Sequence, residues 1–298
     1  MTAILAITRA GPLATVQDLG RFGMLANGIS AAGAMDRAGY LAAGEAVDAP
    51  LGAIEFTRAG LDLVVEQGTC RVGFAGGNFT LRRNGKLLAW PGTTRLSKGD
   101  SLTITPGAAG NYGYLRFDGQ IDVPILLGSL ATSSRAQLGG FSGRALVAGD
   151  RIQLKAAEPE LPVAASRAGA GLIRVIWGLH ADLFAPDVRN RFVTSPFTIS
   201  SRLDRMGVRL GDNEKVFGNS ANLSLVSDAI VPGDIQILGD GTPIVLMRDH
   251  QPTGGYPRIA TVISADFDRF AQLRPGATVA FLPVTVEHAH QLLRSSLE

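Results

Sequence analysis

The 298-residue chain contains 46% hydrophobic and 18% charged residues and has a formal net charge of +2. This length predicts one large or two medium domains with an ample core, and the scattered basic residues give no electrostatic reason to expect a nucleic-acid partner. The single cysteine, Cys70, excludes a disulfide framework. No apolar run approaches the ~18 residues of a membrane span, and no basic region precedes the short apolar segment at the N-terminus. We therefore expect a cytoplasmic protein with neither a membrane nor a nucleic-acid partner.

Short β-rich segments between Gly, Pro and Asn turns dominate the first half of the chain. Leu61–Val65 and Phe79–Arg82 alternate partly between apolar and polar residues, which is typical of a sheet with one face in solvent. Many short strands with few helices favour a mainly β protein built from barrel-like β domains. The predicted strands are Leu61–Glu66, Thr69–Ala75, Phe79–Arg83, Ser101–Pro106, Tyr112–Phe117 and Arg151–Lys155.

Helical spacing is limited to a few segments. Asp36 lies near the start of the first, where a carboxylate suits the helix dipole. Ser264 is the expected N-cap of the third, with Asp266 and Asp268 in its first turn. The predicted helices are Gly33–Val47, Asp182–Val193, Ser264–Leu273 and Thr285–Leu293.

An Ala- and Pro-rich stretch between Lys155 and Gly171 lacks strong periodicity and is the candidate linker. We therefore predict an N-terminal β-barrel-like domain over residues 1–156, a linker over residues 157–171 and a C-terminal β-barrel domain over residues 172–298.

The stretch Ile244–Asp266 is the candidate site around which the second half is organised. Two apolar runs flank a polar cluster and a Pro/Gly turn that contains Gly254 and Gly255. Paired glycines let the backbone approach a ligand closely and can form an anion-binding nest, here next to Arg258. A tight hairpin that needs positive φ is the alternative.

Three Asp-Arg clusters lie beside glycines in predicted loops. An Arg can clamp a carboxylate or phosphoryl group, while a nearby Asp can act as a base or hold that Arg in position. A structural ion pair is the alternative for each cluster. Two of the clusters share the pattern Asp-Arg-x-Gly, which suggests an internal duplication. The clusters are Asp18 with Arg21, Asp36 with Arg37, and Asp204 with Arg205.

No metal site is predicted. His288 and His290 are two residues apart on a predicted helix, so they point in different directions. His250 lies at a strand end, where a hydrogen-bonded structural role is the more common one. The glycine-rich stretch Gly139–Arg144 lacks the Lys and Ser/Thr of a Walker loop.

Several segments together resemble the allophanate hydrolase subunit 2 family, and the resemblance runs in the right order from residue 8 to residue 285. That family includes the C subunit of bacterial 5-oxoprolinase and the second half of the carboxyltransferase domain of urea carboxylase. Three positions depart from the usual family pattern: Phe22 replaces Pro, Pro252 replaces Thr, and Arg258 replaces Lys, which changes the donor geometry. The segments are Thr15–Arg21, Ala32–Arg37, Ser201–Leu210, Ser227–Gln236 and Gly254–Val262.

The resemblance implies a cyclophilin-like β-barrel and one component of an ATP-dependent 5-oxoprolinase, which opens 5-oxoproline to L-glutamate. It also implies two partners, a subunit-1 (B-like) protein and a lactam-hydrolase (A-like) protein, and ATP with Mg as the cofactor. Activation of the lactam by phosphorylation needs cations and N–H donors around the transferring group.

Two sets of residues follow as candidates within that reaction. The catalytic candidates are Asp249, Arg258, Asp204 and Arg205. The candidates for substrate or phosphate binding are Gln251, Thr253, Gly254, Gly255, Tyr256, Asp18, Arg21, Asp36 and Arg37.

Two other functions remain open. A carboxyltransferase component would move a carboxyl group from carboxybiotin to urea or a related amide; because the chain has no Met-Lys-Met, a partner would supply the biotin. A non-catalytic regulatory protein that antagonises a kinase inhibitor would use the same loops as a protein interface.

Overall fold

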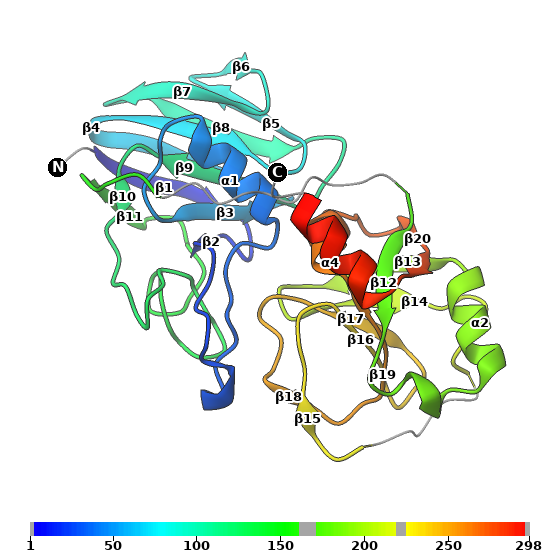
Figure 1. Ribbon diagram of the computed structural model, residues 1–298. Helices are drawn as coiled ribbons and strands as arrows, with labels where there is room; N and C mark the ends of the chain where they lie inside the picture. The colour runs from blue at the N-terminus through cyan, green and yellow to red at the C-terminus, as the bar shows by residue number, and fades with distance from the viewer. Residues whose placement is uncertain (1–2, 161–170, 219–224, 296–298) are drawn as a thin grey trace. The chain divides into compact units, whose positions relative to one another are not determined.

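The computed structural model describes residues 3–160, 171–218 and 225–295 of the chain. Strands predominate throughout, so the prediction of a mainly β protein with a few short helices is confirmed (Figure 1). Most of the predicted linker, residues 161–170, lies outside the described residues. No helix in the described part is long and apolar enough to cross a membrane.

The chain divides into two compact units. Unit 1 comprises Met1–Phe22 and Ala31–Ala165, and unit 2 comprises Gly23–Ser30 and Ser166–Glu298. Each unit contains its own large sheet.

Unit 1 is built on an 11-stranded sheet organised around one long strand, β4 (Leu61–Ala75). The first part of β4 pairs with β1 and β8, and its last part pairs with β7 and β9. The prediction of two separate strands here is wrong, because Gly68 adopts a φ of 75° without ending the strand. The other elements of unit 1 are β1 (Ala3–Ala10), β2 (Thr15–Gln17), α1 (Arg37–Glu45), β3 (Ala53–Thr57), β5 (Phe79–Arg83), β6 (Lys86–Leu88), β7 (Gly92–Ser97), β8 (Ser101–Pro106), β9 (Tyr112–Phe117), β10 (Gln120–Ile121) and β11 (Arg151–Lys155).

The alternation read from the sequence places the core of unit 1. Leu61, Leu63 and Val65 are buried in a large apolar cluster, whereas Asp62 and Val64 between them are partly exposed. Burial of each such side chain contributes roughly 1.5–3 kcal/mol relative to leaving it exposed. The period of two therefore fixes which face of β4 packs inward.

Unit 2 contains an eight-stranded sheet in the order β20-β13-β14-β17-β16-β19-β12-β21. Its two end strands, β20 and β21, are separated by only Ala280, so the sheet curls until its edges nearly meet, as in a barrel. The strands are β12 (Ile173–Trp177), β13 (Phe197–Leu203), β14 (Gly207–Gly211), β16 (Asp234–Ile237), β17 (Pro243–Leu246), β19 (Arg258–Val262), β20 (Thr278–Val279) and β21 (Phe281–Pro283). A separate two-stranded sheet pairs β15 (Asp228–Ala229) with β18 (Thr253–Gly254).

An aromatic cluster fills part of the interior of unit 2. Phe192 from the helix α2 (Pro186–Thr194) stacks on Phe281 with ring centroids 5.0 Å apart, and Phe197 and Phe217 complete the cluster. Phe197 belongs to β13 and Phe281 to β21, so the cluster packs α2 against strands from distant parts of the sequence.

The helices exist where the sequence predicts them, but several begin later. The first starts after Asp36, whose carboxylate caps it by accepting the Gly39 N–H at 2.9 Å. The second starts at Pro186, which suits a first helical turn, after a short 3₁₀ turn at Ala181–Leu183.

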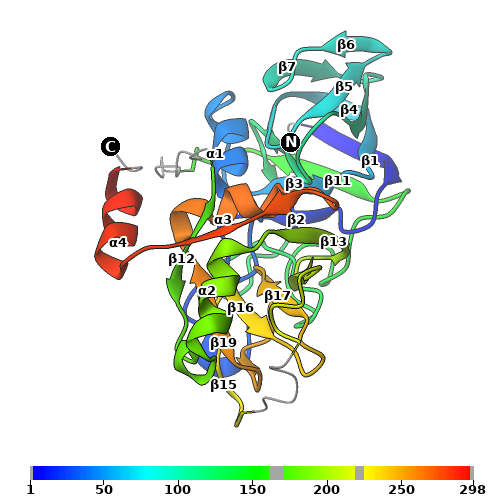
Figure 2. The same cartoon turned by 90° about the vertical axis from the view of Figure 1, so that its right-hand side faces the viewer.

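The last two helices lie side by side in Figure 2. The helix α3 (Ser264–Ala271) begins with Ser264 itself, and Ile263 occupies the N-cap, so the predicted Ser264 cap is wrong. The helix α4 (Val286–Ser295) begins after Thr285, whose hydroxyl accepts the His288 N–H.

Candidate functional site

The two strands of the central stretch do not form a hairpin. Antiparallel β16 lies between β17 and β19, so residues 247–257 cross over from one to the other. Neither Gly254 nor Gly255 has a left-handed φ. The hairpin alternative is therefore wrong, and the glycines are required for another reason.

Close packing explains both glycines. A Cβ on Gly254 would lie 2.5 Å from Gln236 Nε2, and one on Gly255 would lie 2.9 Å from the Leu225 carbonyl oxygen. Gly254 also pairs with Asp228, and Thr253 with Ala229, in the small β15–β18 sheet. The paired glycines thus let the crossover lie directly on its neighbours.

Arg205 and Asp249 form a buried, two-pronged ion pair. Arg205 Nε and Nη2 donate to the two carboxylate oxygens of Asp249 at 2.8 and 2.9 Å, and the side chains are 5% and 6% exposed. The Asp249 N–H also donates to the Arg205 carbonyl at 2.8 Å. The pair joins the β13–β14 turn to the crossover. Arg205 thus has an ion-pair partner other than Asp204, whose carboxylate accepts the Met206 and Gly207 N–H groups instead.

Arg258 is also engaged within the protein. Its Nη2 donates to Asp228 Oδ2 at 2.6 Å, its Nη1 donates to the Ala229 carbonyl at 2.7 Å, and Asp234 Oδ2 lies 3.5 Å away. Its backbone N–H donates to His180 Nδ1, and burial followed by the Arg258 charge lowers the pKa of that imidazole. Arg258 therefore holds β15 in place.

Three of the four predicted catalytic residues are engaged in ion pairs inside the protein. Arg205 and Arg258 each have a carboxylate partner, Asp249 is held by Arg205, and the Gly255 carbonyl accepts the Leu225 N–H. Both arginines of this group are therefore paired with a carboxylate. No group of three or more His, Cys, Asp or Glu side chains able to hold a metal ion occurs within residues 3–160, 171–218 and 225–295.

The other predicted residues lie in unit 1 and fasten loops. Asp18 accepts hydrogen bonds from the Gly20 and Leu130 N–H groups and from the Ser129 hydroxyl. The buried Arg21 donates to the carbonyls of the same loop, residues 126–131. These contacts account for both side chains as loop anchors.

Asp36 and Arg37 also have local roles. Asp36 caps α1, and Arg37 donates to the Leu19 carbonyl while its guanidinium lies 5.2 Å from the centre of the Phe22 ring. Asp204 Oδ1 accepts the N–H of Gly207, as Asp36 accepts the N–H of Gly39. The shared Asp-Arg-x-Gly pattern thus reflects the same local cap in two contexts, a tight turn between strands and a helix start.

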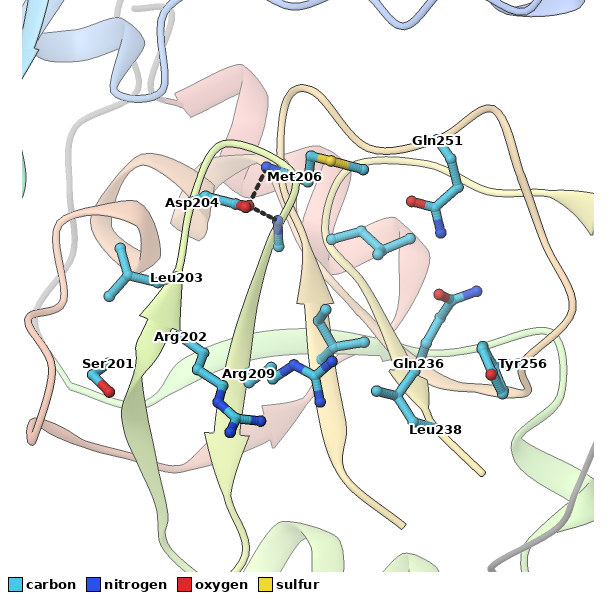
Figure 3. Close-up of a pocket in the computed structure, with 13 residues that line it drawn as sticks. Ser201, Arg202, Leu203, Asp204, Met206, Arg209, Gln236, Leu238, Gln251 and Tyr256 are labelled. Atoms are coloured by element: carbon cyan, nitrogen blue, oxygen red, sulfur yellow. Dashed lines mark hydrogen bonds between the residues drawn. The ribbon is translucent and has the colours of Figure 1, made fainter. Parts of the chain in front are cut away.

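A cavity of about 420 Å³ lies within unit 2, and it contains three of the predicted site residues, Asp204, Gln251 and Tyr256. Figure 3 shows its side chains on strands β13, β14, β16 and β17 and on the crossover. Successive side chains of a strand point to opposite faces of the sheet. Val208, Ile235 and Val245 are buried in the interior, so the residues next to them in sequence point to the opposite face, where they line the cavity. The lining residues are Ser201, Arg202, Leu203, Asp204, Met206, Gly207, Arg209, Gln236, Leu238, Ile244, Leu246, Gln251 and Tyr256.

The register places a cation and an amide on either side of an apolar residue. Arg209 of β14 pairs with Ile244 of β17, and Ile244 pairs with Gln236 of β16. Two strand spacings put the Cα atoms of Arg209 and Gln236 about 10 Å apart. Sequence reasoning missed Arg202, Arg209 and Gln236, although all three lie inside motif segments that it singled out.

The comparisons with known proteins agree with this architecture. The sequence profile of the family described as carboxyltransferase domain, subdomain A and B, matches residues 27–283, and the chain belongs to this family. It is 34% identical to the C subunit of 5-oxoprolinase from Escherichia coli over 96% of this chain and 93% of that protein. It is also 34% identical to the Haemophilus influenzae protein of the same name, over 95% and 92% of the two chains.

A solved structure extends the comparison to a larger enzyme. The crystal structure of the K. lactis urea amidolyase superposes with a TM-score of 0.87 at 26% identity. The match covers 99% of this chain but only 19% of the urea amidolyase chain, so this protein spans about a fifth of that enzyme's length. The chain is therefore homologous both to the 5-oxoprolinase C subunit and to one part of urea amidolyase.

Proposed function

We propose that this protein is one component of an ATP-dependent 5-oxoprolinase, which opens the lactam of 5-oxoproline to give L-glutamate. The observation that supports it best is the end-to-end match, at 34% identity, to two bacterial 5-oxoprolinase C subunits of nearly the same length. The urea amidolyase structure, in contrast, matches at only 26% identity.

The cavity in unit 2 would hold the small substrate in this chain. Its volume of about 420 Å³ lies within the range of small-molecule sites. Because Arg205 and Arg258 already have carboxylate partners, we expect ATP and Mg to bind in the assembled complex. The partners are a subunit-1 (B-like) protein and a lactam-hydrolase (A-like) protein.

A carboxyltransferase component is the second candidate, favoured by the family profile and by the urea amidolyase structure. It would move a carboxyl group from the carboxybiotin of a partner to urea or a related amide. Urea itself carries no negative charge, but the transferred carboxyl group is a carboxylate, which the arginines of the cavity would also suit.

The test is glutamate release from 5-oxoproline and ATP by this protein mixed with its purified subunit-1 and lactam-hydrolase partners. We expect activity that requires all three proteins. Full activity from the two partners without this chain, or none from a well-formed complex, would refute the proposal. Carboxylation of urea by carboxybiotin would then be the next assay.

A further inference from the structure

Two arginines are brought together on the wall of the unit 2 cavity. Ile199 pairs with Leu210, and Leu203 pairs with Val208, so residues 200–202 of β13 face the single residue Arg209 of β14. This bulge bends β13 and redirects its side chains, and the Ser200 hydroxyl accepts the backbone N–H of Arg202 at 3.1 Å. Figure 3 shows the Arg202 and Arg209 side chains next to each other at one end of the cavity.

These arginines differ from the others nearby in having no carboxylate partner. Arg174, Arg205 and Arg258 each form an ion pair at 2.8 Å or less. Within the described residues, no carboxylate oxygen lies within 4.0 Å of the guanidinium of Arg202 or Arg209. Like charges on neighbouring strands destabilise a sheet, so the arrangement favours an anion between them.

The nearby carboxylates are committed elsewhere. Asp204 accepts the N–H groups of Met206 and Gly207 at 2.7 and 3.0 Å. The Thr242 N–H lowers the pKa of the Asp240 carboxyl most, and the Arg209 charge contributes less. The lining contains two Arg and one Asp, so its formal charge is +2 − 1 = +1.

The lining of the cavity also contains an unpartnered amide. Gln236 is 1% exposed, and its Nε2 has no hydrogen-bond partner in the part of the chain that the structure describes. A buried amide without a partner is destabilising, so a ligand that supplies one binds with that advantage. Gln251 adds a second amide to the same lining. An amide side chain can donate to a carbonyl and accept from an N–H, which matches a lactam.

We propose that this cavity selects a small molecule in which a carboxylate lies next to an amide or lactam. Arg202 and Arg209 bind the carboxylate, Gln236 binds the amide, and Ile244 between them packs against the hydrocarbon of the ligand. The proposal deepens the proposed function and rests on it for the choice of 5-oxoproline as probe. It assigns substrate binding to this chain rather than to a partner.

Titration calorimetry on the full chain with matched probes tests the proposal. 5-Oxoproline has both groups, 2-pyrrolidinone lacks the carboxylate, and cyclopentanecarboxylate lacks the amide. We expect 5-oxoproline to bind at least tenfold more tightly than either. Arg202→Gln and Arg209→Gln should each weaken its binding by about tenfold to a hundredfold and leave 2-pyrrolidinone unaffected. Arg294→Gln on the exposed face of α4 removes the same charge away from the cavity and should change nothing.

Inorganic phosphate and ATP distinguish a carboxylate site from a phosphate site. Loss of phosphate or ATP binding in the two Arg variants, with 5-oxoproline binding intact, would overturn the proposal. So would absence of 5-oxoproline binding to the wild-type chain. Binding that depends on both arginines, in a chain whose complete complex releases no glutamate, would support the cavity assignment and refute the 5-oxoprolinase function. Glutamate release by the complete complex, with the KM for 5-oxoproline unchanged in both Arg variants, would support the 5-oxoprolinase function and refute the cavity assignment.

Discussion

Removing the Asp249 carboxylate tests whether the Arg205–Asp249 pair stabilises unit 2 or performs chemistry. Both side chains are nearly buried and joined by two hydrogen bonds. Asp249→Leu leaves the Arg205 guanidinium buried without its counter-charge, which costs about 3–5 kcal/mol. In a unit of this size that loss lowers the melting temperature by about 10–20 °C.

The two tryptophans allow unit 2 to be followed alone. Trp90 lies in unit 1 and Trp177 in unit 2, so the fluorescence of a Trp90→Phe background reports on unit 2. Asp182→Leu is the control, because it breaks a pair with Arg189 in which the Asp side chain is 96% exposed, and it should cost less than about 1 kcal/mol.

The double variant Arg205→Met/Asp249→Leu separates the two roles. If the pair is structural, apolar replacement of both partners recovers most of the stability and leaves turnover by the reconstituted complex largely intact. A catalytic pair would give a stable but inactive double variant. A cost below about 1 kcal/mol for Asp249→Leu would refute the reasoning from burial.

Three further changes follow from particular contacts. Gly254→Ala places a Cβ 2.5 Å from Gln236 Nε2; we expect about fivefold weaker 5-oxoproline binding by calorimetry, with little change in melting temperature. Burial lowers the pKa of His250, so the unfolded state takes up more protons and stability falls as the pH drops below about 6.5. His250→Gln should flatten denaturant midpoints measured between pH 7 and 5, and an unchanged slope would contradict this. Asp36→Ala removes the cap of α1 and should cost unit 1 about 1 kcal/mol in urea unfolding, whereas Asp36→Ser should cost less.

Local patterns predicted much of the secondary structure. Four strands, Phe79–Arg83, Ser101–Pro106, Tyr112–Phe117 and Arg151–Lys155, have the predicted bounds, because alternation and flanking turns define them locally. The helix starts were less accurate, because caps and Pro186 act at single positions. The glycine in β4 was read as a turn, since its effect depends on strands that pair from elsewhere in the chain.

The cavity was only partly predictable. Asp204, Gln251 and Tyr256 were predicted as site residues and do line it, whereas Arg202, Arg209 and Gln236 were missed. Their proximity depends on the order β13-β14-β17-β16 and on a bulge opposite one residue. No local pattern in the sequence encodes that register.

The arginines around the cavity of unit 2 fall into two groups, those with a carboxylate partner and those without one, and this division does not follow the sequence motifs. Arg205 lies in the β13–β14 turn and Arg258 at the start of β19, and each is paired with a carboxylate that the fold brings to it. Arg202 lies in the bulge of β13 and Arg209 in β14, and the described residues offer neither an ion-pair partner. An acid opposite Arg209 would form a cross-strand ion pair and stabilise the sheet. The register places Ile244 and then Gln236 there instead, an arrangement that suits the proposed carboxylate-bearing lactam.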